Sequence, residues 1–244
     1  MKYCIVDERL PADCESALLA QGVKIIKLAP LRTVAGAVSS HTDIILFRHG
    51  GNIICPKRYL CENPDTARQI YSLSSFINIK ESPECPEGAY PHDAVFNALV
   101  IGKYLFAKCD SVCRDILDYA DSAGLTVINV KQGYPACTVL AVGDDAAITS
   151  DLGMARILDK LGIDTLTVSE DASVLLPPYK NGFIGGCGGA LGDDIYFAGN
   201  LFSHKDGQRI ADFIESHGKR VKSLASEASW LCDLGGLFFY ENNT

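Results

Sequence analysis

The chain has 244 residues, of which 48% are hydrophobic and 21% charged, a composition typical of a globular protein that buries a substantial core. Its net charge of −8 argues against a nucleic-acid partner, because binding a phosphate backbone requires a clustered positive face. The N-terminal stretch lacks the apolar core of a signal peptide, and no apolar run approaches membrane-spanning length, so we expect a cytoplasmic protein with no membrane partner.

Ten cysteines are scattered along the chain, and no two of them form the Cys-x-x-Cys pair typical of zinc knuckles and redox motifs. We therefore expect most of them to be reduced thiols that pack as small apolar residues. No cofactor and no metal are expected. One metal-binding alternative stays open, because His41, His92, Cys137 and Cys232 would make a Cys₂His₂ set if the fold brought them together.

A strand-length apolar run followed by a polar or Pro-containing break occurs five times, at intervals of about 42 to 52 residues. These runs lie at 4–6, 53–55, 105–107, 147–149 and 196–198. A candidate helix follows each run, and in the clearest cases its apolar residues are three and four positions apart. The candidate helices are 12–21, 64–75, 110–122, 151–160 and 206–217. Four of them end at a glycine, the residue that most easily adopts a left-handed conformation: Gly22, Gly124, Gly162 and Gly218.

A second strand is predicted after each helix, at 23–28, 76–79, 125–130, 163–168 and 221–224. After a variable loop comes a third apolar run, at 44–47, 94–101, 138–142, 183–186 and 231–239. Turns rich in Gly, Asn or Asp then lead to the next unit, as β-hairpins require. The clearest hairpin lies within 90–106, where Gly102-Lys103 separates two apolar runs.

The repeating unit is therefore strand, helix, strand, loop, strand, and one copy cannot bury its helix and its sheet face alone. We predict an α/β fold in which five units pack around a shared core as a pseudo-symmetric α/β propeller. The units lie at about 3–51, 52–102, 103–144, 145–193 and 194–244. Because no linker interrupts them, residues 1–244 are expected to form a single domain. A doubly wound α/β sheet with coincidental spacing is the alternative.

This five-unit pattern resembles the pentein superfamily, which includes arginine deiminases, dimethylarginine dimethylaminohydrolases, agmatine deiminases, amidinotransferases and a non-catalytic ribosome anti-association factor. Two short stretches carry local matches. Pro91-His92-Asp93-Ala94-Val95-Phe96 is similar to the His-containing motif of the arginine deiminases, and Gly133-Tyr134-Pro135-Ala136-Cys137-Thr138 is similar to the pattern around the nucleophile of the enzymes. Two features differ. The enzymes usually carry Glu-Gly-Gly-Asp where this chain has His49-Gly50-Gly51-Asn52, and they place the cysteine in the last repeat, whereas Cys137 lies in the third.

Alignment of the third runs brings five short stretches to equivalent places, which in a ring converge near one axis and form a cavity. They are His41-Thr42-Asp43, His92-Asp93, Cys137, Gly186-Cys187 and Cys232-Asp233. The resemblance implies that Cys137 is the nucleophile and His92 the general acid and base, with Asp93 holding the substrate or orienting the ring. The predicted substrate-binding residues are His41, Asp43, Asn97 and Gln132. Cys187, which has glycines on both sides, is the alternative nucleophile, although the same glycines would suit a tight hairpin.

The predicted function is that of a cysteine-dependent hydrolase or amidinotransferase acting on the C–N bond of a guanidino or related small molecule. An acidic chain suits a cationic small-molecule substrate. The alternative is a non-catalytic pentein-fold protein that binds a partner or a small ligand, and the missing carboxylates around Gly50-Gly51 favour it. We lean towards catalysis because of His92-Asp93 and Cys137. These motifs specify neither the substrate nor the oligomeric state.

Overall fold

The computed structural model of the chain describes residues 1–225 and 229–242. Among these residues the strands form five three-stranded sheets and one two-stranded sheet, β12 (Val174–Leu175) with β16 (Leu231–Cys232). In every three-stranded sheet the middle strand pairs antiparallel with one neighbour and parallel with the other. The strands of each sheet are named with the antiparallel neighbour first, the middle strand second and the parallel neighbour third. The first three sheets are β17 (Phe238–Glu241), β1 (Lys2–Asp7) and β2 (Val23–Leu28); β3 (Phe47–His49), β4 (Asn52–Pro56) and β5 (Asn78–Ser82); and β6 (Leu99–Ile101), β7 (Tyr104–Ala107) and β8 (Thr126–Asn129). The other two are β9 (Val139–Ala141), β10 (Ala146–Thr149) and β11 (Asp164–Thr167); and β13 (Gly188–Leu191), β14 (Asp194–Phe197) and β15 (Arg220–Ser223).

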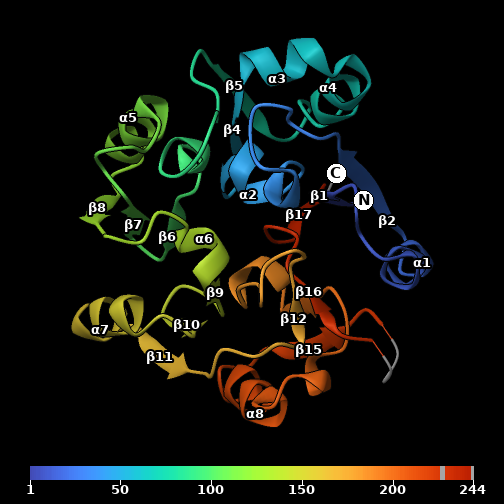
Figure 1. The fold of residues 1–244 in the computed structure, drawn as a ribbon, viewed down its shortest axis with the longest axis vertical. Helices are drawn as coiled ribbons and strands as arrows, with labels where there is room; N and C mark the ends of the chain where they lie inside the picture. Colours follow the sequence, from blue (N-terminus) through green and yellow to red (C-terminus); the bar gives the residue numbers. More distant parts are fainter. Residues whose placement is uncertain (226–228, 243–244) are drawn as a thin grey trace.

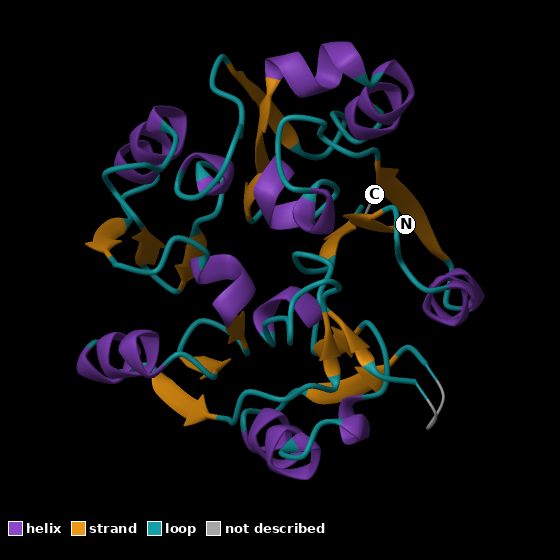
Figure 2. Ribbon diagram, viewed as in Figure 1, coloured by secondary structure: helices purple, strands orange, loops and turns teal. Residues whose placement is uncertain are grey.

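The longer helices connect the middle strand of each sheet to its parallel neighbour, the crossover that a parallel pair requires. They are α1 (Ala12–Ala20), α3 (Lys57–Glu62) with α4 (Pro64–Tyr71), α5 (Arg114–Ser122), α7 (Leu152–Lys160) and α8 (Gly207–Ser216). The predicted glycine stops are confirmed, since Gly22, Gly124, Gly162 and Gly218 all have positive φ, between 67° and 78°. Figures 1 and 2 show these helices on the outside of the molecule, whereas the short helices α2 (Thr42–Ile45) and α6 (Pro135–Thr138) and strands such as β9 and β17 lie nearer its centre.

The predicted hairpins are confirmed, but the third runs are not continuous strands. Each of the first four contains or adjoins a short helical turn followed by a strand of three or four residues. The turns are α2 (Thr42–Ile45), η2 (His92–Ala94), α6 (Pro135–Thr138) and η3 (Gly185–Cys187). The fifth run is likewise broken, between β16 and β17. A short, buried apolar run fits one turn of helix as well as a strand, so hydrophobic periodicity alone could not separate the two.

The remaining 3₁₀ turns are η1 (Gly36–Val38) and η4 (Leu201–Ser203).

Gly102 explains why the second hairpin turns at the predicted position. Its φ is +54°, and a Cβ at this position would lie only 2.5 Å from the carbonyl oxygen of Asp144, so only glycine fits. The paired strands here are β6 and β7, so the hairpin is shorter than the apolar run 94–101 indicated.

The middle strands are buried on both faces, and alternate residues pack against different neighbouring sheets. On β1, Ile5 packs in one cluster with Ile53 of β4, whereas Cys4 and Val6 pack in another with Tyr196 of β14. Five such clusters among the described residues join β1 to β4, β4 to β7, β7 to β10, β10 to β14 and β14 to β1. No described sheet has more than three strands, so the alternative of one doubly wound sheet is wrong. No helix among the described residues is both long and apolar enough to cross a membrane.

Candidate active site

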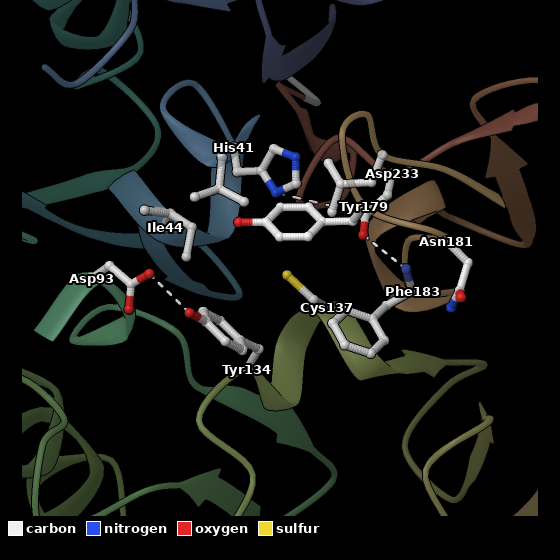
Figure 3. Close-up of a pocket in the computed structure, with 11 residues that line it drawn as sticks. His41, Ile44, Asp93, Tyr134, Cys137, Tyr179, Asn181, Phe183 and Asp233 are labelled. Carbon is white, nitrogen blue, oxygen red and sulfur yellow. Dashed lines mark hydrogen bonds and ion pairs between the residues drawn. The ribbon is translucent and has the colours of Figure 1, made fainter. Parts of the chain in front are cut away.

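A cavity of about 280 Å³ lies where the short turns meet (Figure 3). Residues far apart in the sequence line it, and they fall into two groups. The polar side chains are those of His41, Asp93, Tyr134, Cys137, Tyr179, Asn181 and Asp233. The apolar ones are those of Val38, Ile44, Leu176 and Phe183.

Cys137 is presented to this cavity by α6. Pro135 occupies the start of α6, where its fixed φ favours the helical turn and its missing N–H costs no hydrogen bond. The Sγ atom of Cys137 donates to Oδ2 of Asp43 over 2.6 Å and accepts a hydrogen bond from Nδ2 of Asn97 over 3.6 Å. Burial, and next the carboxylates of Asp43 and Asp233, raise the pKa of the Cys137 thiol well above its ordinary value. At neutral pH the resting side chain is therefore a thiol.

Asp43, at the start of α2, shares the environment of that thiol. Its side chain is 1% exposed, and burial raises its pKa to about 8. Oδ2 accepts from Cys137, while Oδ1 has no hydrogen-bond partner among the described residues. The pair therefore holds its protons tightly, because two negative charges at this distance would repel in a medium of low polarity.

His41 is the histidine that reaches the site. It is fully buried directly before α2, with Nδ1 3.9 Å from Oδ1 of Asp233 and Nε2 4.0 Å from Oδ2 of Asp7. Neither ring nitrogen has a hydrogen-bond partner in the described part of the chain. Burial lowers the pKa of His41, and this outweighs the opposing effects of the two carboxylates. The resting imidazole is thus neutral, with two unpartnered nitrogens beside the cavity.

Asp233 lies next to His41 and is held by backbone donors. Its Oδ2 accepts from the N–H of Phe183 at 2.8 Å and its Oδ1 from the N–H of Gly235 at 3.2 Å. Gly186 packs directly against this carboxylate, since a Cβ there would lie 1.8 Å from Oδ1. Gly186, beside Cys187, thus lets its segment approach the segment that carries Asp233 closely. The sequence had suggested instead that these glycines admit a substrate or form a tight hairpin.

Three side chains could together hold a metal ion. Ligand atoms of His41, Cys137 and Asp233 all lie within 4.8 Å of one another. Zinc accepts this combination of nitrogen, sulfur and oxygen donors. The predicted Cys₂His₂ set is wrong, because His92 lines a different depression and not the cavity that His41 and Cys137 line. The expectation that the protein uses no metal stays a prediction.

Among the described residues, Asp93 and Asp233 are the two carboxylates that line the cavity. Asp93 is 6% exposed; Oδ2 accepts a hydrogen bond from the hydroxyl of Tyr134 over 2.8 Å, and Oδ1 has no partner among the described residues. Figure 3 shows Asp93 and Tyr134 on the other side of the Cys137 sulfur from Asp233. Carboxylates thus lie on both sides of the thiol.

Three of the predicted site residues lie elsewhere. His92 is exposed and lines a separate depression with Arg58 and Glu84, so the structure does not bring it to Cys137. The reason is local: successive residues of a 3₁₀ turn point in directions about 120° apart, and Asp93, not His92, faces the centre. Gln132 lies outside the cavity, where its Nε2 donates to Oδ2 of Asp151 over 2.7 Å. Cys187 is buried in an apolar cluster, and its thiol donates to the backbone carbonyl of Phe183.

The structure brings together Cys137, His41, Asp43, Asp93 and Asn97 from the predicted set. The importance of Asp233 was visible only as an equivalent position in the fifth unit. Asp7, Tyr134 and Tyr179 were missed as site residues. A signal for Asp7 existed, since this aspartate directly follows the first predicted strand, 4–6, but nothing in the sequence indicated that it faces His41.

A family model described as a family of unknown function, DUF6873, matches residues 5–238. No curated protein matches the chain in sequence. Several solved structures match its fold. An agmatine deiminase from C. jejuni is 10% identical with a TM-score of 0.55, covering 92% of this chain and 87% of that one. The dimethylarginine dimethylaminohydrolase of Pseudomonas aeruginosa, complexed with citrulline, is 10% identical with a TM-score of 0.53 and coverage of 91% of both chains. The inosamine-phosphate amidinotransferase of Streptomyces griseus is 12% identical with a TM-score of 0.50, covering 89% and 76%.

These three solved structures belong to the pentein superfamily. At 10–12% identity the likeness concerns the fold, and it confirms the mixed α/β, pentein-like architecture that the repeats predicted.

Proposed function

The chain belongs to the family of unknown function DUF6873, and we propose that within the pentein fold it is a cysteine-dependent enzyme that cleaves a C–N bond of a guanidino or related amidino compound. One observation carries the proposal. A buried thiol, an imidazole with two unpartnered nitrogens and a carboxylate lie within 4.8 Å of one another beside a cavity of about 280 Å³. Nucleophile, proton carrier and charged partner are the groups that such a reaction requires.

Binding of the substrate comes first. The planar cation enters between Asp93 and Asp233, whose carboxylates are suited to its N–H groups. Its positive charge offsets the negative charges that raise the pKa of the Cys137 thiol, so the thiolate becomes accessible only when substrate is present. Asn97 positions the sulfur through its amide N–H.

The chemical steps use His41 as the proton carrier. The Cys137 proton passes to neutral His41 across a gap of at most 4.8 Å, which one water or one substrate nitrogen can bridge. The thiolate then forms a C–S bond to the guanidino carbon. The C–N bond to the leaving amine breaks as His41 returns the proton to that nitrogen. Asp7 and Asp233 stabilise the transient imidazolium.

The amidino group bound to Cys137 is then released. In a hydrolase, water gives up a proton to His41, its oxygen bonds to the carbon, and the C–S bond breaks to regenerate the thiol and release a urea-type product. In an amidinotransferase, an acceptor amine takes the place of that water. Both outcomes use the same residues.

The repeat boundaries extend this proposal to the architecture. We assign residues 1–244 to one domain of five strand-helix-strand-loop-strand units, with boundaries at about 3–51, 52–102, 103–144, 145–193 and 194–244. Each three-stranded sheet then combines the third strand of one unit with the first two of the next. Pairing of β17 with β1 and the five clusters between neighbouring sheets support a propeller-like ring.

A non-catalytic ligand-binding protein is the alternative, and one observation favours it: the resting thiol of Cys137 is firmly protonated. One experiment separates the two functions. The protein is incubated with a panel of alkyl and amino-acid guanidines, and ammonia, released amine and ureido product are measured. We expect turnover that Cys137→Ser abolishes and that His41→Gln lowers by about 10²- to 10⁴-fold, the usual range for a lost acid-base group.

Mass spectrometry provides the second readout. In the His41→Gln variant we expect an amidino adduct on the peptide that contains Cys137, because release from the sulfur needs the same base. Turnover that survives Cys137→Ser would refute the assignment of the nucleophile. Ligand binding without turnover or adduct across the panel would instead establish the non-catalytic alternative.

A further inference from the structure

The cavity has an unbalanced set of charges. Asp93 and Asp233 line it, and Asp43 lies behind the Cys137 thiol, yet none of the described residues that line the cavity is a lysine or arginine. Two cationic side chains lie nearby without lining it. Arg9 donates to both oxygens of Asp7, at 2.9 and 2.5 Å, so its charge is already paired. Lys180 follows Tyr179 on the same loop but is exposed to solvent.

A substrate carboxylate would therefore find no ionic partner inside this cavity. It would lie among like charges, and no ion pair with a cationic side chain would offset the free energy that the carboxylate loses when it leaves water. Asp93 contributes directly to this repulsion, because its buried Oδ1 has no hydrogen-bond partner among the described residues, and no described lysine or arginine lines the cavity beside it. The same carboxylates favour a single positive charge.

The rest of the wall suits an apolar group. Val38, Ile44 and Leu176 contribute aliphatic surface, and Phe183 with Tyr179 contributes aromatic surface. Tyr179 is 54% exposed while it also lines the cavity, so it lies where the cavity meets solvent. Figure 3 shows its ring beside the space into which Cys137 points. Apolar walls with a few placed polar groups are typical of a site for an amphipathic small molecule.

We propose that the preferred substrate is a guanidine with one apolar alkyl or arylalkyl substituent and no carboxylate, and that the site discriminates against guanidino acids such as amino acids. This inference rests on the proposed function. The guanidinium head binds between Asp93 and Asp233 near Cys137, and the tail lies along Ile44, Leu176 and Tyr179 towards solvent.

The test compares three ligands that differ at one end only: n-pentylguanidine, 5-guanidinopentanoate, in which a carboxylate replaces the terminal methyl group, and 5-guanidinopentanamide, its neutral analogue. Binding is measured by calorimetry and, where turnover occurs, kcat/KM is compared. We expect pentylguanidine to be preferred over the acid by a factor on the order of 10² or more, since a site without a partner for a buried charge rejects it strongly. The amide should lie much closer to pentylguanidine than to the acid.

Variants separate charge from shape. Asp93→Asn keeps the acceptor for Tyr134 but removes a negative charge, and it should narrow the preference for pentylguanidine over the acid by about tenfold. The matched control is Asp121→Asn, an exposed aspartate on α5, which should leave the ratio unchanged.

Each outcome has a distinct meaning. Equal binding of the acid and pentylguanidine overturns this inference and leaves the guanidino-modifying function intact. Equal exclusion of the acid and the amide assigns the discrimination to size and also overturns it. Failure of all three ligands to bind overturns the proposed function itself, and this inference with it.

Discussion

Replacement of Asp43 by asparagine should make the Cys137 thiol more acidic and more reactive. The carboxylate accepts the thiol proton over 2.6 Å, and it is the second cause of the raised thiol pKa after burial. With an effective dielectric constant of about 20, two unit charges at this distance repel by about 6 kcal/mol, or about four pKa units, as an upper bound. Because burial is unchanged in Asp43→Asn, we expect the thiol pKa to fall by about two to four units.

Alkylation by iodoacetamide reports this change. At a pH below the thiol pKa of both the wild type and the variant, the thiolate fraction rises tenfold for each unit by which the thiol pKa falls. The intrinsic reactivity of a thiolate decreases as its pKa falls, with a Brønsted coefficient of about 0.4–0.5. The net expectation is a rate increase of about 10- to 100-fold near pH 9, where the Asp43 carboxyl of the wild type, with a pKa of about 8, is charged. Peptide mass spectrometry follows Cys137 alone, and exposed Cys61 serves as the reference within the same molecule.

Wild type and Asp121→Asn should give the same Cys137 rates, because Asp121 is exposed on α5. A Cys137 rate in Asp43→Asn that equals or falls below the wild-type rate near pH 9, with Cys61 unchanged, would refute the electrostatic argument. Thermal unfolding of each variant checks that the fold is retained.

Three further predictions concern stability and the site. The folded-state pKa of Asp43, about 8, lies above its ordinary value of 3.8, so the folded state keeps a proton that the unfolded state releases. Wild-type stability should therefore fall between about pH 4 and 8 by up to ~1.4 kcal/mol per pH unit relative to Asp43→Asn; equal urea-unfolding free energies of the two proteins at pH 5 and 7 would contradict this. Gly186→Ala places a Cβ 1.8 Å from Asp233 and should cost about 1–3 kcal/mol in urea unfolding, whereas Gly36→Ala, with nothing within 4 Å, should change stability by less than about 0.5 kcal/mol. His92→Ala should leave kcat/KM within about twofold, because His92 is exposed in a different depression; a tenfold loss would return it to the site.

The local matches identified the thiol that lines the cavity but not the histidine beside it. Cys137 and Asp93 were identified from short motifs, and both line the cavity. His92 was selected because its surroundings resemble the His-containing motif of the arginine deiminases and because it adjoins Asp93, but it is exposed in a separate depression. His41, which the alignment of third runs placed at the equivalent point of the first unit, is the histidine that lines the cavity. An equivalent position in another repeat unit therefore predicted which histidine lines the cavity better than adjacency to Asp93 in the sequence did.

The sequence by itself determined the repeating order of strands and helices, because apolar periodicity, helix-ending glycines and hairpin turns are local properties of the backbone. It also contained the chemically capable residues. Only the tertiary structure decided which of them meet. The rotation of each short turn sets whether one residue or its neighbour faces the centre, and the close packing permitted by Gly186 sets where Asp233 lies. Burial then raised the pKa of Asp43 and of Cys137, because loss of water depends on neighbours that are distant in the chain.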